Sequence, residues 1–405
     1  MRRIIRGTPG GGGPMLRTDR STAPPDGADM KGNQIVELAE LFSEEVNPAQ
    51  TRMFELLNDP DVSQISVNRF DRLFYVDSRG TQFIGDMFPS PAAYRAWLDD
   101  LLLLTDVGYE SVEGAQTSVI EGSFNPERTS LHRSIHVATT EITRGDPALT
   151  IRKQPHQIIT LDTMLGQGMM SEEMRRFLEI GVRGRANFLI SGGSGAGKTT
   201  LARALSWYID PTQRIITVEE IDELHLADRL PNVVSLTTYK KVGPQGETIR
   251  RIELEDLVRE ALRMRADRIW VGETRGKESY SLVRACNSGH DGSCTTIHAD
   301  NGTQAVKQLV TYVMESGMTE EVAREQVAQA FHLVVQIARV KLGRRVITEI
   351  TELEPVREGN EQRRNTIFVY DHHTGGFRQT GQPSPRLLQD WARYGVNYDT
   401  GWRVS

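Results

Sequence analysis

The chain has only two cysteines among its 405 residues, Cys286 and Cys294. Two thiols cannot build a multi-disulfide framework, and so low a count is typical of proteins from a reducing compartment. A zinc site that also uses His290 and His298 is an alternative, but the spacing fits no familiar zinc-binding pattern. We therefore expect two free thiols and no metal at these positions.

The sequence also lacks a long hydrophobic run. The longest, at Leu101–Leu104, is far shorter than the roughly 20 apolar residues that a membrane-spanning helix needs. Three arginines near the start resemble the beginning of a signal peptide, but Gly10–Gly13 follow them in place of an apolar segment. The expected protein is soluble and cytoplasmic.

A basic surplus is missing as well, because the formal net charge is -6, and aromatic residues make up only 7% of the chain. Nucleic-acid-binding proteins usually carry a basic surface, and single-strand motors add stacking aromatic side chains. We expect no sequence-specific binding of nucleic acid, and a protein that moves along nucleic acid stays open as an alternative.

The most informative segment that is present is Asn187–Thr200, which reads NFLISGGSGAGKTT. A short apolar run of strand type leads into Gly192, four residues, Gly197, Lys198 and Thr199, which is the spacing of a phosphate-binding loop. Backbone N–H groups of such a loop form an anion nest, and the N-terminus of the following helix adds positive potential. An ordinary glycine-rich turn is the alternative, and the strand before the loop and the helix after it argue against that alternative.

The phosphate-binding loop predicts an ATP site with bound Mg²⁺. Lys198 is expected to contact the β- and γ-phosphates, and the Thr199 hydroxyl to bind the metal ion. The residues predicted to contact the nucleotide from this loop are Gly192, Gly193, Ser194, Gly195, Ala196, Gly197, Lys198, Thr199 and Thr200.

Two later strands are predicted to end in acidic residues. The first is Arg214–Val218, and the second, Ala266–Glu273, ends in Gly-Glu in the manner of a Walker B strand, where an acid orients water at the γ-phosphate. Ligand chemistry collects where parallel strands end. His298 ends a short strand and is a candidate γ-phosphate sensor, whereas His290 is as well explained by a structural role. The acidic cluster after the first strand is Glu219, Glu220, Asp222 and Glu223.

Composition and periodicity divide the chain into four parts with an α/β pattern. Residues 1–33 form a flexible Gly/Pro-rich tail, 34–155 a smaller α/β domain, 156–355 the ATPase domain and 356–405 a C-terminal extension. Helices are predicted at 35–42, 91–104, 172–182, 200–207, 253–265, 320–331 and 385–393. Strands are predicted at 61–67, 73–76, 134–137, 148–152, 187–191, 214–218, 266–273, 295–298, 333–338, 345–351 and 366–370.

Four segments in this order and spacing resemble the secretion ATPase superfamily of type II and type IV secretion and type IV pili, and within it the CpaF-like Flp-pilus and type IV secretion branch. The resemblance covers about Asp61 to Pro355. The segments are Gly192–Thr200, ITVEEIDEL, LVREALRMRADRIWVGETRG and NSGHDGSCTTIHA.

The resemblance implies a RecA-like P-loop ATPase core with a smaller N-terminal α/β domain, assembled as a hexameric ring. It implies that ATP hydrolysis powers pilus assembly or secretion at the inner face of the inner membrane, with pilus or secretion platform proteins as partners. The cargo and the membrane partner are not specified by the sequence.

The resemblance also assigns roles to residues outside the phosphate-binding loop. The family's acidic box falls on Glu219, Glu220 and Glu223, with Glu219-Glu220 in place of the usual Glu-Asp pair and Glu223 as its functional glutamate. Glu273 resembles the catalytic glutamate, with Arg275 beside it, and the histidine box includes His290 and His298. The family's arginines that reach the phosphates from the N-terminal domain match Arg133 and Arg152. The presence of both Glu223 and Glu273 argues against a switch that binds nucleotide without turnover, and no acceptor pocket for a small-molecule kinase is recognisable.

Overall fold

The computed structural model describes residues 48–59, 61–77, 79–102, 119–123, 133–138, 143, 145–153, 159–242, 248–340, 343–355 and 364–398. The predicted tail at 1–33, the predicted helix at 35–42 and the segment 154–158 lie outside these residues.

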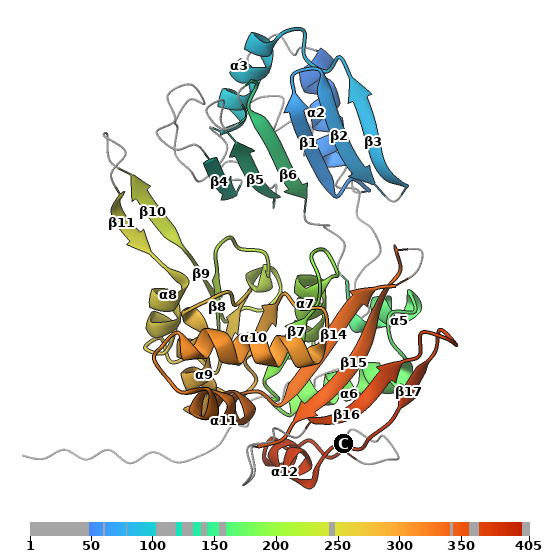
Figure 1. The fold of residues 1–405 in the computed structure, drawn as a ribbon, viewed down its shortest axis with the longest axis vertical. Coiled ribbons are helices and arrows are strands. Elements are labelled where there is room, and N and C mark those ends of the chain that lie inside the picture. The colour runs from blue at the N-terminus through green and yellow to red at the C-terminus, as the bar shows by residue number, and fades with distance from the viewer. Residues whose placement is uncertain are drawn as a thin grey trace, which may run out of the picture.

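A six-stranded sheet with two helices forms the N-terminal part (Figure 1). Neighbouring strands are antiparallel, in the order β3-β2-β1-β6-β5-β4. Its elements are α2 (Pro48–Asn58), β1 (Gln64–Arg69), β2 (Arg72–Asp77), β3 (Gly80–Gly85), α3 (Pro91–Leu102), β4 (Val119–Ser123), β5 (Arg133–Ala138) and β6 (Ala148–Lys153).

Alternating burial along the strands shows why this part folds as a half-buried sheet. Ile65 and Val67 of β1 are fully buried while their neighbours are not, and the buried side chains pack with those of α2 and α3 in one cluster. The predicted hairpin between β1 and β2 is confirmed. The Ser90 hydroxyl accepts from the Ala93 N–H at 3.1 Å, so the predicted N-cap of α3 is confirmed too.

A nine-stranded sheet forms the centre of the second part, in the order β17-β16-β15-β14-β7-β13-β12-β8-β9. From β14 to β9 the neighbours are parallel, and β15, β16 and β17 continue antiparallel beyond β14. The strands are β7 (Phe188–Ser191), β8 (Ile215–Glu219), β9 (Val233–Thr237), β12 (Arg268–Val271), β13 (Cys294–Ile297), β14 (Leu333–Arg339), β15 (Arg345–Leu353), β16 (Arg364–Tyr370) and β17 (Phe377–Gln379).

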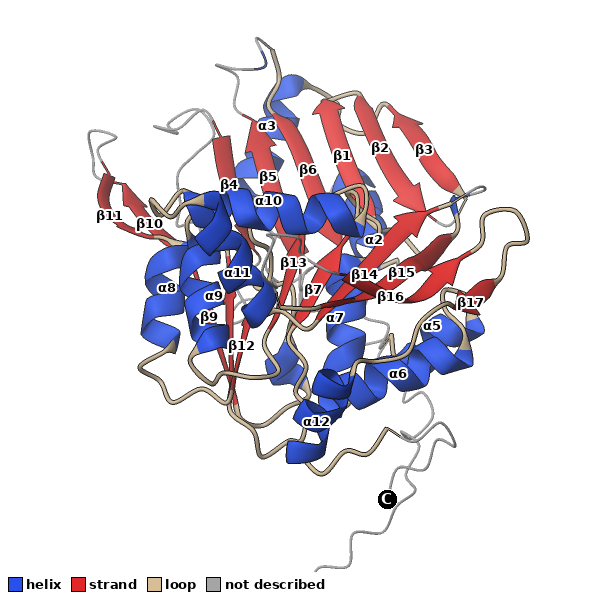
Figure 2. Ribbon diagram, turned by 60° about the horizontal axis from the view of Figure 1, so that its bottom comes forward, coloured by secondary structure: helices blue, strands red, loops and turns tan. Residues whose placement is uncertain are grey.

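Helices cover both faces of this sheet (Figure 2). Side chains of α5, α6, α7 and α12 pack into one buried cluster and those of α8, α9, α10 and α11 into another, so the second part has three layers. The helices are α5 (Leu161–Gly166), α6 (Glu172–Arg183), α7 (Lys198–Ser206), α8 (Leu254–Ala261), α9 (Glu278–Asn287), α10 (Gly302–Met314), α11 (Glu320–Ala330) and α12 (Pro385–Arg393).

Several elements were not predicted from the sequence. The helices α9 and α10, the strand β9 and the hairpin of β10 (Tyr239–Val242) and β11 (Thr248–Ile252) are examples. Residues 356–405 are predicted from the sequence to be a separate C-terminal extension. In the structure β16 pairs with β15, and the buried Trp391 of α12 packs against Phe177 of α6, so both belong to the same three-layer unit.

Within the part of the chain that the structure describes, no helix is both long and apolar enough to cross a membrane.

Candidate active site

The phosphate-binding loop leaves the buried strand β7 at Gly192 and ends in the first turn of α7. Gly195 and Gly197 have φ values of +64° and +106°, which side-chain-bearing residues rarely adopt. A Cβ atom on Gly192 would lie 2.3 Å from the Ile337 carbonyl oxygen, so this position has no room for a side chain. The glycine spacing read from the sequence therefore has a steric cause in the fold.

Lys198, His298 and Glu273 meet at the carboxyl ends of β7, β13 and β12. The Lys198 ammonium group lies 3.1 Å from His298 Nδ1, and His298 Nε2 lies 3.1 Å from Glu273 Oε1. With Lys198 donating to Nδ1, Nε2 carries the imidazole proton and donates to Glu273. One histidine thus joins the loop cation to the carboxylate of the Walker B strand.

The charges of this cluster depend on one another. Burial is the main cause that lowers the pKa of Lys198, and the Glu273 carboxylate acts in the opposite direction. Burial and the Lys198 charge together lower the pKa of His298, which favours the neutral imidazole. Lys198 also donates to the carbonyl oxygens of Gly192 and Gly193, at 3.1 and 3.3 Å, so its ammonium group lies directly at the loop.

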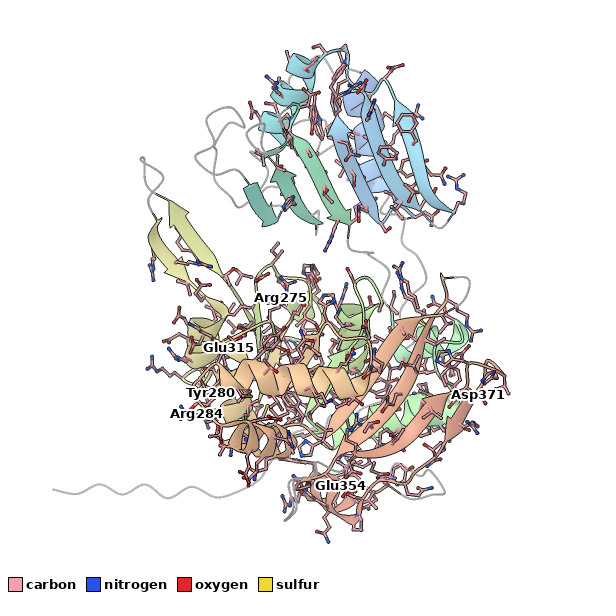
Figure 3. The ribbon with its side chains drawn as sticks, viewed as in Figure 1. Arg275, Tyr280, Arg284, Glu315, Glu354 and Asp371 are labelled. Carbon is pink, nitrogen blue, oxygen red and sulfur yellow. The ribbon has the colours of Figure 1, made fainter. Side chains whose placement is uncertain are left out.

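Arg275 extends this cluster towards solvent. Its guanidinium donates to Glu273 Oε2 at 2.9 Å and to Glu220 Oε2 at 3.2 Å, and the bond with Glu273 is the main cause that raises its pKa. Figure 3 places Arg275 at the edge of the second part that faces the N-terminal sheet.

Glu219 and Glu223 of the predicted acidic box lie in different environments. Glu219 is 4% exposed, and its carboxyl accepts the backbone N–H groups of Glu223 and Leu224 at 3.1 Å each. Burial, reinforced by the Asp222 charge, raises the pKa of Glu219 well above its usual range. Glu219 therefore stabilises the loop that carries Glu223. Among the described residues, Glu219 makes no contact with Lys198. The Glu223 side chain is partly buried; burial raises its pKa and the positive charge of Arg152 opposes that shift.

The N-terminal part contributes Arg152, at the end of β6. Its charge acts on Glu223 and also lowers the pKa of His298, so its guanidinium lies within electrostatic reach of both. Arg133 belongs to β5, opposite Lys153, but its side chain lies outside the described residues.

Glu278 is a residue that the sequence reasoning missed. It is 7% exposed and lies at the start of α9, where its carboxylate accepts the N–H groups of Arg275 and Gly276. Glu278 thus fixes the turn that follows Glu273. A carboxylate three residues after Arg275, in the first turn of a helix, is the signal that would have revealed it.

Arginines of β14 and β15 also contact the phosphate-binding loop and were not predicted. Arg339 donates to the Gly195 carbonyl oxygen at 3.0 Å, and Arg345 donates to the same oxygen at 3.2 Å. They approach from strands that follow the loop by more than a hundred residues, so no local sequence signal links them to it.

The two cysteines are free and buried, and burial raises the pKa of both thiols. Cys294 begins β13 and His298 follows its far end, so the four side chains of the alternative zinc site do not converge. His290 Nδ1 lies 3.1 Å from the Ala285 carbonyl oxygen at the end of α9, which agrees with the structural interpretation of this histidine.

A glycine loop between a buried parallel strand and a helix, a lysine in that loop and a glutamate on a neighbouring strand define a P-loop ATPase. Comparison with known proteins agrees with this class. Residues 128–370 match the family model described as type II/IV secretion system protein. The chain belongs to this family and is one of its ATPases.

Relatives and structures of this family resemble the chain over most of its length. A putative conjugal transfer protein of Mycobacterium tuberculosis is 30% identical over 311 residues, which cover 76% of this chain and 85% of the relative. The conjugal transfer protein TrbB of Rhizobium radiobacter is 29% identical over 317 residues, covering 76% and 88%. The crystal structure of the pilus retraction motor PilT with bound ADP has a TM-score of 0.51 at 16% identity, covering 86% of this chain and 87% of that one, which supports the fold alone.

Proposed function

We propose that this chain is an ATP-hydrolysing motor that works as a homo-hexameric ring and drives secretion, conjugal transfer or pilus assembly at the inner face of the inner membrane. The observation that carries the catalytic part is the continuous chain of contacts from Lys198 through His298 to Glu273. The names of the relatives support the transport part, because they describe conjugal transfer proteins.

In the proposed reaction, water attacks the terminal phosphorus of ATP and the bond to the ADP oxygen breaks. Glu273 accepts the proton of that water, and His298 keeps the Glu273 carboxylate in place. Lys198 and the N–H groups of the loop stabilise the charge on the phosphates, and Arg152 and Arg275 add positive charge from the solvent side. Glu223 is the second proposed catalytic carboxylate, and Glu219 supports it through the loop.

The loop residues fit a nucleotide accompanied by Mg²⁺. Thr199 is the second residue of α7, its side chain is partly exposed, and its hydroxyl has no hydrogen-bond partner among the described residues. Its oxygen is therefore available to a metal ion, which would supply positive charge between the β- and γ-phosphates.

Two measurements test this function. Release of phosphate from ATP by the purified chain tests the reaction, and no release above that of Lys198→Ala would contradict it. The molar mass in solution with and without nucleotide tests the ring, which requires six times the 45.4 kDa of one chain. An ATPase rate that rises severalfold only with single-stranded DNA would favour a nucleic-acid translocase instead.

A further inference from the structure

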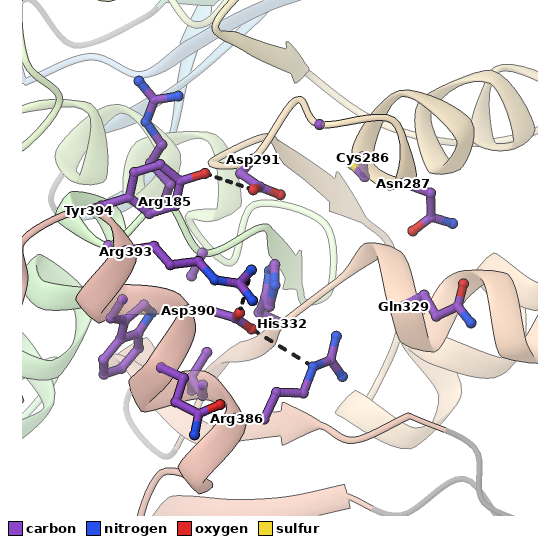
Figure 4. Close-up of a pocket in the computed structure, with 16 residues that line it drawn as sticks. Arg185, Cys286, Asn287, Asp291, Gln329, His332, Arg386, Asp390, Arg393 and Tyr394 are labelled. Carbon is purple, nitrogen blue, oxygen red and sulfur yellow. Dashed lines mark hydrogen bonds and ion pairs between the residues drawn. The ribbon is translucent and has the colours of Figure 1, made fainter.

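A polar cavity of about 480 Å³ lies at the base of the nine-stranded sheet, at the opposite end of β7 from the phosphate-binding loop (Figure 4). Its walls come from the turn before β7, the end of α9, the loop before β13, the end of α11 and one side of α12. A cavity of this size can hold a ligand as large as a mononucleotide. The active site described above uses none of the residues that line it.

Three guanidinium groups line this cavity, and among the described residues each is paired with a single carboxylate. Arg386 and Arg393 share the Asp390 carboxylate, at 3.8 and 3.1 Å, as the dashed lines in Figure 4 show. Arg185 has its nearest carboxylate at 3.9 Å, although its side chain is only 21% exposed, and it lies over the ring of Tyr394. A guanidinium has five N–H groups, so one carboxylate partner leaves most of the donors of each arginine open to a ligand.

His332 adds a neutral donor to the same cavity. Its Nδ1 accepts the Asn187 N–H at 2.9 Å, so the proton lies on Nε2, which has no partner among the described residues. Burial is the main cause that lowers the pKa of His332, so the ring stays neutral near pH 7.

The buried region behind the cavity also carries a positive charge. Arg268 is 1% exposed and donates only to Gln213 and to the carbonyl oxygens of Gly292 and Val182, with no carboxylate partner among the described residues. Asp291, a carboxylate of the cavity wall, accepts the Tyr394 hydroxyl at 2.8 Å. A buried cation without a counter-ion raises the positive potential around it.

We propose that this cavity is a second ligand site, which binds a small molecule through a phosphate or carboxylate group held by Arg386 and His332, with Arg185 at the end of the cavity formed by Tyr394. The aromatic ring of Tyr394 suits a ligand with a flat apolar part beside the anionic group. This site goes beyond the proposed motor function, because it is separate from the nucleotide site.

Three elements connect the cavity directly with the active site. Asn287 lines the cavity and ends α9, whose other end carries Glu278, the residue that holds the turn after Glu273. Asp291 lies just before β13, whose last residue is followed by His298, and Ala186 lies just before β7, which leads into Gly192. Rigid elements of this kind can transmit a small displacement, so occupancy of the cavity is expected to change the ATPase rate.

The test is calorimetric titration of the full chain, saturated with Mg·ADP, with phenyl phosphate and, separately, with benzoate at constant ionic strength. The expected result is saturable binding of at least one of them, weakened at least about tenfold in Arg386→Gln and less in Arg185→Gln. The two probes decide between phosphate and carboxylate ligands. Arg378→Gln is the matched control, because Arg378 is exposed on β17 and lies outside the cavity.

Binding that is equal in all three variants would place the anion elsewhere on the protein and overturn the proposal, as would the absence of saturable binding. Arg386 is 41% exposed, so its replacement is not expected to prevent folding. The ATPase rate at saturating probe tests the connection: a change of at least about twofold that is lost in Arg386→Gln supports it. If the probe binds in the cavity and the ATPase rate stays unchanged, the ligand site is supported, but its link to the active site is contradicted.

Discussion

The two sheets of this protein differ in strand direction, and this difference decides where the chemistry lies. In the nine-stranded sheet, the parallel strands β7, β8, β12 and β13 end at one edge, so Lys198, Glu273 and His298 meet there although they are distant in sequence. In the six-stranded sheet all neighbours are antiparallel, so consecutive strands end at opposite edges. Among the described residues, this sheet contributes to the site the positive charge of Arg152, which acts on Glu223.

The parallel sheet therefore carries the proposed reacting residues, and the antiparallel sheet adds a positive charge beside them. If ATP attracts Arg152, the N-terminal part closes on the core when ATP is bound and is released after hydrolysis. The following experiments test this division of roles.

Replacing Lys198 by Ala is expected to have the largest effect. The substitution removes the charge-assisted hydrogen bonds to the phosphates, worth about 3 kcal/mol, so kcat/KM should fall by at least about a hundredfold and nucleotide binding should be largely lost. Titration with a fluorescent ATP analogue measures binding. Lys307→Ala, on the exposed side of α10, is the control. If Lys198→Ala binds ATP with native affinity, the phosphate-binding loop is not the nucleotide site.

Replacing Glu273 by Gln keeps the size of the side chain and removes the base. We expect ATP binding to persist while kcat falls at least about a hundredfold, the low end of general-base contributions. Steady-state phosphate release measures the rate. A rate close to that of the native chain would show that another group accepts the proton.

Replacing Arg152 by Ala tests the part played by the antiparallel sheet. The ATPase rate should fall about tenfold, equivalent to about 1.4 kcal/mol, while the affinity for ADP stays nearly unchanged, because the charge is needed at the γ-phosphate. Arg133→Ala is expected to act in the same direction. If ADP affinity falls as much as the rate, Arg152 stabilises the bound nucleotide rather than the reaction.

A chain that starts near Leu161 sharpens the same comparison. The core of the second part is a separate buried cluster, so this shorter chain should bind nucleotide but turn it over far more slowly than the full chain. Hydrolysis at the full-length rate would reduce the N-terminal part to an adaptor.

A change of pH should alter the ATPase rate less than the changes above, and we expect His298 to be the group that titrates. Because the pKa of His298 lies below its usual value near 6.5, the ring is neutral above that pH and gains a proton only as the pH falls further. Protonation would place a second cation beside Lys198, so the rate should fall severalfold on the acid side. His298→Gln cannot gain this charge, so its acid-side fall should be weaker; an identical profile would exclude His298 as the titrating group.

The smallest effect is expected at the cysteines. Cys286→Ser should change neither the metal content nor the ATPase rate by more than about twofold, because both thiols are buried and protonated. Elemental analysis for zinc checks this expectation. Stoichiometric zinc that is lost in the variant would contradict it.

The sequence by itself determined the local features of the core. The glycine spacing of Gly192–Thr199 required a tight strand-to-helix turn, and apolar strands such as β7, β8 and β12 were recognisable because burial on both faces demands continuous hydrophobic runs. Caps such as Ser90 and Thr319 were recognisable because a hydroxyl before a helix satisfies its free N–H groups. The family followed from the order of four such segments.

Only the tertiary structure decided which side chains share an environment. Glu219 and Glu223 are four residues apart, yet one is buried against the backbone of its own loop and the other lies within reach of Arg152. The contacts of Glu278 with the turn after Glu273, and of Arg339 with Gly195, depend on strand order and on how helices cross the sheet. Local sequence patterns report backbone preference and burial, whereas contacts between distant segments arise only when the whole sheet is assembled.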